Sequence, residues 1–236
     1  MRLPFRLVLV GLCALSLEAF QYGAPARAPQ AGPWRALFDG TSMSAWRGYK
    51  GDVMPAGWHV TDGAMVKDVP TGDIVTREEF SDFELELDWK IGKAGNSGIF
   101  YRGHEDFADV YDTAPEYQLL DDIEADDNKL PSHLAGSVYD IIAPAPGHLK
   151  PVGEWNQARI VARGNHVEHW LNGAKLLEYE LGSEAWNTAF ATSKFSKVAR
   201  TPSFANFAKY SKGYIGIQAN HPGSLALRAV RIRELR

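Results

Sequence analysis

The stretch FELELDWK, residues 83–90, decides the fold. Its apolar side chains occupy alternate positions and its charged side chains the others: Phe83, Leu85, Leu87 and Trp89 alternate with Glu84, Glu86, Asp88 and Lys90. Successive side chains of a β-strand point to opposite faces of the sheet. The stretch is therefore predicted to be a strand with one face in a core and the other in water.

Shorter runs of the same character lie on both sides of this stretch: GIFYR (98–102), SVYDII (137–142), ARIVAR (158–163), HVEHWL (166–171) and GYIGIQ (213–218). Asn172-Gly173 predicts a tight hairpin, because both central positions of a type I′ turn need positive φ. A helix is indicated only around residues 183–199, with Ser183 as its N-cap. The pattern predicts one all-β domain, residues 34–236, an antiparallel β-sandwich or jelly roll with one short helix.

The final run LALRAVRIREL, residues 225–235, contains one departure from simple alternation. Arg228 shares a face with Val230 and Ile232. It is either an inward arginine in a buried ion pair, which is the interpretation we favour, or the mark of a β-bulge.

The first 26 residues have the pattern of a secretory signal peptide. Arg2 and Arg6 precede the apolar run LVLVGLCALSL, and Ala24-Pro25-Ala26 resembles a cleavage site. Residues 27–33 are predicted to be a linker. We expect an exported protein, periplasmic or extracellular, without a stable membrane anchor after cleavage; an uncleaved anchor is the alternative. The single cysteine, Cys13, lies within the signal segment, so the mature chain would have no disulfide.

The formal net charge of -4 argues against a nucleic-acid partner, which a basic patch would normally meet. The chain also has no P-loop, no Rossmann glycine pattern and no G-x-S-x-G elbow. Asp122, Glu124 and Asp126 alternate like a calcium loop, but the expected glycine is missing, so a solvated acidic loop is the favoured interpretation. The sequence leaves the cofactor open, with a divalent metal as one possibility, and it leaves the oligomeric state open.

The stretch EYQLLDD, residues 116–122, raises the question of function. Tyr117 and Leu119 would share one face of a strand, which leaves Glu116 and Gln118 on the other. Nearby runs also mix polar and aromatic residues: Asn96, Ser97, Tyr101 and Arg102; Ser137, Tyr139 and Asp140; Gln218, Asn220 and His221. Side by side, such strands would form a concave surface suited to a sugar, with plain solvent exposure as the alternative.

Several segments together resemble the 3-keto-disaccharide hydrolase family: FDGTSMSAW, GWHVTDGAMV, GDIVTREEFSDFELELDWK, GNSGIFYR, EYQLLDD, GSVYD, GEWNQARIVARGNHVEHWLNG, GYIGIQ and RIREL. The resemblance covers about residues 34–235. It implies a concanavalin-like or glucanase-like sandwich. It also implies an oligosaccharide or glycoside substrate carrying a 3-keto group, cleaved by β-elimination across C1 and C2 and then rehydrated. No NAD-binding pattern is present, so a separate dehydrogenase would have to make the 3-keto substrate.

The resemblance also implies roles for individual residues. Glu116 or Asp121 of the motif E-x-Q-x-x-D would be the base, the other holding a hydroxyl or a metal. Arg102 would stabilise the enolate, and His133 is the candidate acid. The residues expected to bind substrate are Gln118, Tyr139, Asn96, Gln218, His221 and Lys197.

The chain departs from the family pattern at Ala219-Asn220, where many members carry an aspartate. This change puts the substrate scope in doubt. Two other functions stay open: a non-catalytic carbohydrate-binding module and an ordinary glycosidase with two carboxylates. Convergence of Glu116, Asp121 and Arg102 in one cleft would favour the 3-keto-glycoside enzyme.

Overall fold

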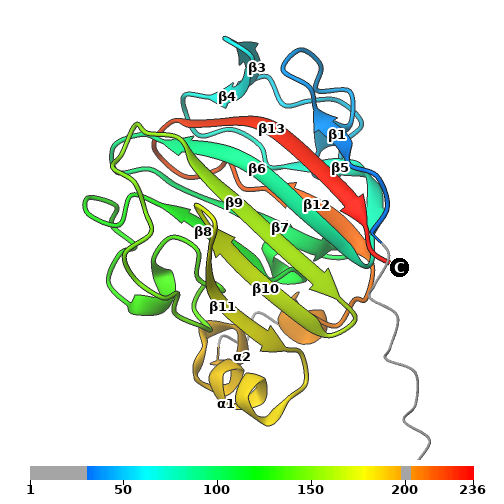
Figure 1. Ribbon diagram of the computed structural model, residues 1–236, viewed down its shortest axis with the longest axis vertical. Helices are drawn as coiled ribbons and strands as arrows, with labels where there is room; N and C mark the ends of the chain where they lie inside the picture. The colour runs from blue at the N-terminus through cyan, green and yellow to red at the C-terminus, as the bar shows by residue number, and fades with distance from the viewer. Residues whose placement is uncertain (1–30, 198–202) are drawn as a thin grey trace, which may run out of the picture.

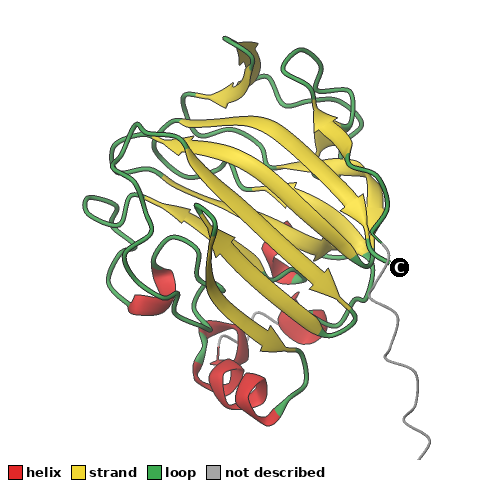
Figure 2. Ribbon diagram, in the orientation of Figure 1, coloured by secondary structure: helices red, strands yellow, loops and turns green. Residues whose placement is uncertain are grey.

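A computed structural model describes residues 31–197 and 203–236, so the predicted signal segment, Cys13 and most of the linker lie outside it. Two antiparallel sheets pack face to face (Figures 1 and 2). The larger sheet has eight strands: β1 (Arg35–Phe38), β3 (Trp58–Thr61), β4 (Ala64–Lys67), β6 (Phe83–Ile91), β9 (Asn156–Arg163), β10 (His166–Leu171), β11 (Ala174–Glu180) and β13 (Leu225–Glu234). The smaller has five: β2 (Trp46–Gly48), β5 (Ile74–Phe80), β7 (Asn96–Gly103), β8 (Glu116–Leu120) and β12 (Gly213–Ile217).

The order of the strands places the FELELDWK stretch in the middle of the larger sheet. That order is β11-β10-β9-β6-β13-β4-β3, with β1 also paired to β13, and the smaller sheet runs β2-β5-β12-β7-β8. The four apolar side chains of this stretch are at most 1% exposed and form the centre of the core: Phe83, Leu85, Leu87 and Trp89. Burial of each contributes roughly 2 kcal/mol. The predicted sandwich is therefore confirmed, and its core lies between the sheets.

Two local predictions are confirmed and one is wrong. Asn172 and Gly173 have φ values of 50° and 85° and close the β10–β11 hairpin. The last strand has a bulge, since its register shifts after Arg228 and Ala229 has a φ of 48°. The interpretation that we favoured, a buried ion pair, is wrong: the bulge turns the Arg228 side chain outward, where its Nε contacts Asp88 Oδ2 at 3.0 Å.

The helical segment lies at one end of the sandwich, beyond β11 (Figure 1). It contains α1 (Glu184–Thr192) and α2 (Lys194–Lys197), and the 3-10 turns are η1 (Val110–Asp112), η2 (Pro131–His133) and η3 (Ser203–Asn206). Ser183 is the N-cap of α1 as predicted, because its Oγ accepts the Trp186 N–H at 3.1 Å. The helix is interrupted at Ser193, whose backbone is extended. None of the helices in the described part of the chain is long and apolar enough to span a membrane.

Candidate functional site

A polar cavity of about 290 Å³ opens on the face of the smaller sheet that points away from the core. Its lining residues come from β7, β8, the loop after β12, the loop after β8, η1 and α2: Asn96, Asp109, Tyr111, Glu116, Gln118, Asp127, Tyr139, Lys194, Gln218, Asn220 and His221. The volume is near the low end of small-molecule sites, so a sugar of one or two rings is a better match than a polymer.

Strand β8 directs its polar side chains into this cavity. Tyr117 and Leu119 are fully buried in the core, and the Tyr117 hydroxyl donates to the Trp170 carbonyl of the opposite sheet at 3.0 Å. Alternation therefore turns Glu116 and Gln118 outward, as predicted. Strand β8 is the last strand of its sheet, and its edge away from β7 is paired with a loop. The Gly136 N–H donates to Gln118 O at 2.8 Å and the Tyr139 N–H donates to Glu116 O at 3.1 Å.

Glu116 is the most perturbed acid in the cavity. Its side chain is 5% exposed, and burial raises its pKa to about 8, with Asp73 and Asp127 acting in the same direction and Lys194 against it. The Gln118 amide, oriented with Nε2 toward its acceptors, donates to Glu116 Oε1 at 3.1 Å. A carboxylate with a pKa near 8 is a far stronger base than an exposed one.

Gly98 makes room for this carboxylate. It lies on β7 opposite Gln118, and a Cβ added to it would lie 1.8 Å from Glu116 Oε1. Any larger residue would have to displace the carboxylate. The second glycine of the motif GNSGI, Gly98, is therefore explained by the space that the Glu116 carboxylate occupies.

The buried Lys67 and the partly buried Asp73 hold the loop after β12 against the cavity. Asp73 Oδ1 accepts the Ala219 N–H at 2.7 Å, and Lys67 Nζ donates to His221 O at 2.7 Å. Lys67 is fully buried, and burial lowers its pKa to about 8; burial also raises the pKa of Asp73 to about 6. At the position of the family departure, Ala219 packs into the core and Asn220 lines the cavity.

The same loop offers groups for sugar hydroxyls. Gln218 is 7% exposed, and its Oε1 is buried without a hydrogen-bond partner among the described residues, although the side chain lines the cavity. Burial lowers the pKa of His221, so its imidazole is neutral at pH 7. A buried acceptor without a partner is costly, and a hydroxyl donor would relieve that cost.

A hydrogen-bonded chain of side chains begins at Tyr139 and Asp127, which line the cavity, and continues behind them. The Tyr139 hydroxyl donates to Asp127 Oδ2 at 2.7 Å, and His133 Nδ1 lies 2.8 Å from Asp127 Oδ1. His133 Nε2 lies 2.8 Å from Asp140 Oδ1, and Asp140 Oδ2 accepts the backbone N–H of Lys194 at 2.5 Å. His133 does not line the cavity and both its ring nitrogens contact carboxylates, so its placement does not match the predicted role of acid.

The structure brings six of the predicted residues together around the cavity: Glu116, Gln118, Tyr139, Asn96, Gln218 and His221. Their individual roles stay predictions. Lys197 is the last residue of α2, and its side chain is outside the described part of the chain. Lys194, Asp127, Asp109 and Tyr111 also line the cavity and were not predicted.

The structure does not support catalytic roles for Asp121 and Arg102. Asp121 closes a turn, accepting the N–H groups of Ala94 at 2.8 Å, Ile123 at 3.0 Å and Glu124 at 3.1 Å. Burial would raise its pKa, but these donors outweigh that effect and lower it. A carboxylate with a lowered pKa and three donors is a poor base.

Arg102 lies near the far end of β7 from Asn96 and has a φ of 55°. Its guanidinium donates to the carbonyls of Ser81 at 2.9 Å and Gly164 at 2.7 Å, and contacts Asp82 at 3.2 Å. These acceptors lie in the turns before β6 and between β9 and β10. Arg102 therefore joins the two sheets and does not line the cavity.

The acidic loop forms ordinary protein contacts. Asp122 Oδ1 accepts the Ala135 N–H at 2.8 Å, and Glu124 pairs with Lys93 at 3.0 Å. Within residues 31–197 and 203–236, the group of side chains with metal-ligand spacing is on the larger sheet and away from the cavity: His166, Glu168 and Glu178. The cavity residues can hold hydroxyls and transfer a proton with their own side chains.

Comparisons with known proteins agree with this architecture. A 3-keto-disaccharide hydrolase of Bacteroides thetaiotaomicron is 34% identical over 225 residues, covering 84% of this chain and 77% of that protein. The crystal structure of a candidate glycosyl hydrolase of Parabacteroides distasonis is similar with a TM-score of 0.78 and 30% identity, over 86% of this chain and 94% of that one.

A GH16 endo-β-1,3(4)-glucanase shares the fold alone, with a TM-score of 0.53 and 9% identity over 91% of this chain and 94% of that one. The 3-keto-alpha-glucoside-1,2-lyase-like domain matches residues 33–233, which is nearly all of the described chain. The sandwich, the order of the motifs and these matches agree, and the chain belongs to the 3-keto-alpha-glucoside-1,2-lyase-like family.

Proposed function

We propose that the protein cleaves 3-keto-glycosides by β-elimination across C1 and C2, followed by addition of water. The observation that carries the proposal is Glu116, a buried carboxylate with a pKa raised to about 8 in a polar cavity of sugar size. The similarity to a 3-keto-disaccharide hydrolase supports the substrate class.

The chemistry needs one strong base beside C2. Glu116 takes the C2 proton, and the C–H electron pair becomes the C2=C3 bond of an enolate whose negative charge rests on the C3 oxygen. The C3 carbonyl then re-forms, a C1=C2 bond forms and the C1–O bond breaks. The leaving oxygen takes a proton, for which protonated Glu116 is the source. Water adds its hydroxyl to C1 and a proton to C2, which completes a net hydrolysis.

The other cavity residues hold the sugar. Asn96, Gln118 and Gln218 supply amides, Tyr139 supplies a ring beside the cavity, and His221 supplies a neutral imidazole. These groups match hydroxyls and the apolar C–H faces of a ring. The 3-keto group is essential, because a glucoside with a hydroxyl at C3 cannot delocalise charge from C2.

The deciding experiment follows deuterium. The purified protein is incubated in deuterium oxide with an aryl 3-keto-glucoside, with and without a chelator, beside the matching unoxidised glucoside. We expect aglycone release with deuterium at C2 from the keto substrate alone. Release without deuterium would contradict elimination, and sugar binding without release would leave a binding module. Chelator sensitivity would reveal a metal requirement.

A second candidate is an ordinary two-carboxylate glycosidase, favoured by the presence of Glu116 and Asp127 in one cavity. Both oxygens of Asp127 already contact Tyr139 or His133, which argues against a free nucleophile. Cleavage of the unoxidised glucoside at a comparable rate would establish this alternative and refute the first proposal.

We also propose that the protein acts outside the cytoplasm, as the signal pattern in residues 1–26 predicts. Mass spectrometry of the protein isolated from expressing cells tests this. A mature N-terminus near residue 27 is expected, and an intact Met1 terminus on cytoplasmic protein would contradict it.

A further inference from the structure

Lys194 places at the cavity an ammonium group that has no ion-pair partner among the described residues. It lines the cavity, and its Nζ lies 4.3 Å from the ring centre of Tyr139, 5.4 Å from that of Phe195 and 5.8 Å from that of Tyr111. No carboxylate in residues 31–197 or 203–236 forms an ion pair with it. Aromatic faces attract a cation without neutralising it, so the ammonium stays available to an anionic oxygen.

The position of Lys194 is set by the break in the helical segment. Ser193 is extended, and α2 starts anew at Lys194, whose N–H donates to Asp140 Oδ2 at 2.5 Å. Asp140 belongs to the loop that pairs with β8, so the start of α2 and the strand carrying Glu116 are joined through one short segment. Phe195, the next residue, stacks on Phe207 at 4.2 Å and anchors the turn.

Lys194 also acts on Glu116 electrostatically. Three charged groups affect that carboxylate: Lys194 lowers its pKa, while Asp73 and Asp127 raise it along with burial. Lys194 is the strongest of the three. The base and the cation that an enolisation requires are therefore in one cavity, close enough to affect each other.

We propose that Lys194 is a catalytic residue that binds the C3 oxygen of the 3-keto sugar and stabilises the enolate charge. The inference rests on the proposed function and adds the electrophile to it. When Glu116 removes the C2 proton, the C3=O π electrons move onto the oxygen beside the ammonium. They return to re-form the carbonyl as the C1–O bond breaks, and the ammonium keeps its protons throughout. Preorganised positive charge at a developing oxyanion is the most effective form of such stabilisation.

This assignment replaces the one that the family resemblance implied for Arg102. The Arg102 guanidinium is held by Ser81, Gly164 and Asp82 away from the cavity. Among the described residues that line the cavity, Lys194 is the one with a lysine or arginine side chain. A lone flexible ammonium also suits a single ketone oxygen, whereas a guanidinium fork suits carboxylates and phosphates.

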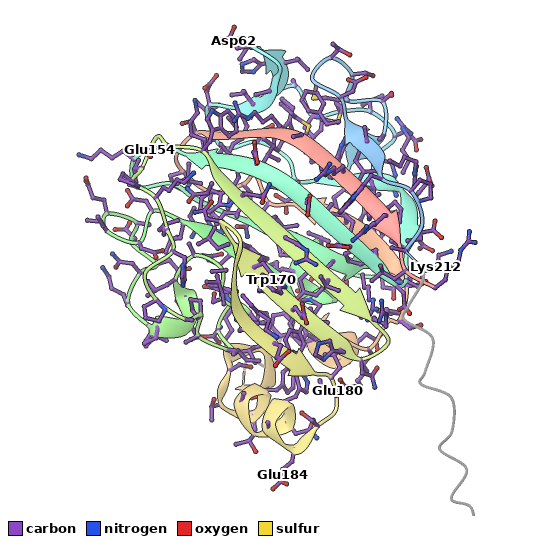
Figure 3. The ribbon with its side chains drawn as sticks, viewed as in Figure 1. Asp62, Glu154, Trp170, Glu180, Glu184 and Lys212 are labelled. Carbon is purple, nitrogen blue, oxygen red and sulfur yellow. The ribbon has the colours of Figure 1, made fainter. Side chains whose placement is uncertain are left out.

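The test compares Lys194→Met, Lys194→Arg and a control, Lys212→Met. Lys212, labelled in Figure 3, is an exposed lysine that pairs with Glu79 at 3.7 Å and does not line the cavity. Two rates are measured over a range of pH with an aryl 3-keto-glucoside: deuterium exchange at C2 and aglycone release. The wild-type protein is measured first, and absence of exchange there would refute the proposed function itself.

We expect Lys194→Met to lower both rates by about 10²- to 10³-fold, the usual loss for a missing oxyanion donor. The acidic limb of its pH–rate profile should move to higher pH, because removing the cation raises the pKa of Glu116. Lys194→Arg should keep the limb in place, and Lys212→Met should match the wild type.

An active wild type with Lys194→Met within threefold of it and an unmoved limb would overturn the inference. A loss of activity matched by a lower melting temperature, with an unmoved limb, would show a structural role and also overturn it. If Lys194→Met does not fold, Lys194→Gln carries the same measurements, since its amide is smaller and polar.

Discussion

The outward faces of the two sheets treat their acidic residues in opposite ways. On β6, Glu84 contacts Arg159 at 2.5 Å and Arg233 at 2.6 Å, Glu86 contacts Arg231, and Asp88 contacts Arg228. On β8, Glu116 has no ion pair with a described residue and instead has a raised pKa. FELELDWK and EYQL show the same alternation, so the pattern gives the face of a carboxylate, and its neighbours decide whether it forms ion pairs or has a raised pKa.

Three tryptophans at the outward face of the larger sheet follow the same rule: Trp170 on β10, Trp155 just before β9 and Trp34 just before β1. The Trp170 ring lies under Arg159 at 4.7 Å, Trp155 under Arg228 at 4.1 Å and Trp34 under Arg231 at 4.5 Å. Figure 3 shows Trp170 on the face of this sheet that is turned to the viewer. Guanidinium groups cover rings that could otherwise stack on a sugar. On the larger sheet the outward acids are thus paired and the tryptophan rings covered by arginines. The smaller sheet carries polar groups without such partners among the described residues, such as Glu116 and the Gln218 Oε1.

The sharpest way to break this comparison is to neutralise one acid on each sheet. Glu116→Gln should lower C2 exchange and aglycone release by about 10²- to 10⁴-fold, because it removes the base. It should not lower the melting temperature above pH 8, because there it removes a poorly solvated charge.

The matched variant is Glu84→Gln, at a side chain that is similarly buried, 4% exposed. It should cost about 2 kcal/mol in the free energy of unfolding, since it weakens charged hydrogen bonds to two arginines, and leave the rates unchanged. If Glu84→Gln lost activity, or Glu116→Gln kept it, the two faces would not differ as described.

Gly98→Ala should have the next largest effect. The new Cβ would displace the Glu116 carboxylate, and a shift of about 1 Å can reduce the rate about 10²-fold. Gly51→Ala is the control, because the nearest atom to its added Cβ is 3.8 Å away. Enzyme kinetics and a crystal structure of the variant check this; full activity would mean that the carboxylate position is not critical.

The pH dependence tests the raised pKa of Glu116. The carboxylate form is the base, so kcat/KM should rise about tenfold per pH unit up to about pH 8 and then level off. Stability should change in the opposite direction. The folded state retains this proton from the ordinary value of 4.5 up to about 8 while the unfolded state loses it, so the free energy of unfolding falls across that window.

Denaturant unfolding of the wild type and Glu116→Gln at pH 5 and pH 8 isolates this contribution. The free energy of unfolding of Glu116→Gln should increase relative to that of the wild type as the pH rises. Equal differences at both pH values, or a plateau in kcat/KM already reached at pH 6, would show that the Glu116 pKa is not raised.

The smallest effect on activity is expected for Arg102→Met. The change removes a guanidinium that is 4% exposed, together with its hydrogen bonds to the Ser81 and Gly164 carbonyls, so it should cost about 1–3 kcal/mol in the free energy of unfolding. The rate per folded molecule should stay within about twofold, since Arg102 does not line the cavity. A large loss in kcat with unchanged stability would restore the catalytic role suggested by resemblance.

The sequence was informative where strict alternation applied. It placed Phe83 in the core, Glu116 and Gln118 on the outward face and the hairpin at Asn172. These features depend on neighbours along one strand or turn. They follow from local geometry.

It failed where the backbone departs from regular geometry. Arg102 has a positive φ, which alternation cannot foresee, and Asp121 closes a turn just past the end of β8. Lys194 was missed because the helix pattern continues through Ser193, where the structure breaks it. Its place in the cavity depends on a hydrogen bond to Asp140, 54 residues away in the chain.

The paired edge of β8 has a consequence for solubility. An outermost strand normally presents free N–H and C=O groups to which another chain can add, which leads to aggregation. Here the segment 136–139 occupies that edge, with Gly136, Ser137 and Tyr139 bonded to the backbone of Glu116 and Gln118. The strand that carries Glu116 is thereby closed to intermolecular pairing, a protection of particular value to a chain whose single cysteine cannot form a disulfide within it.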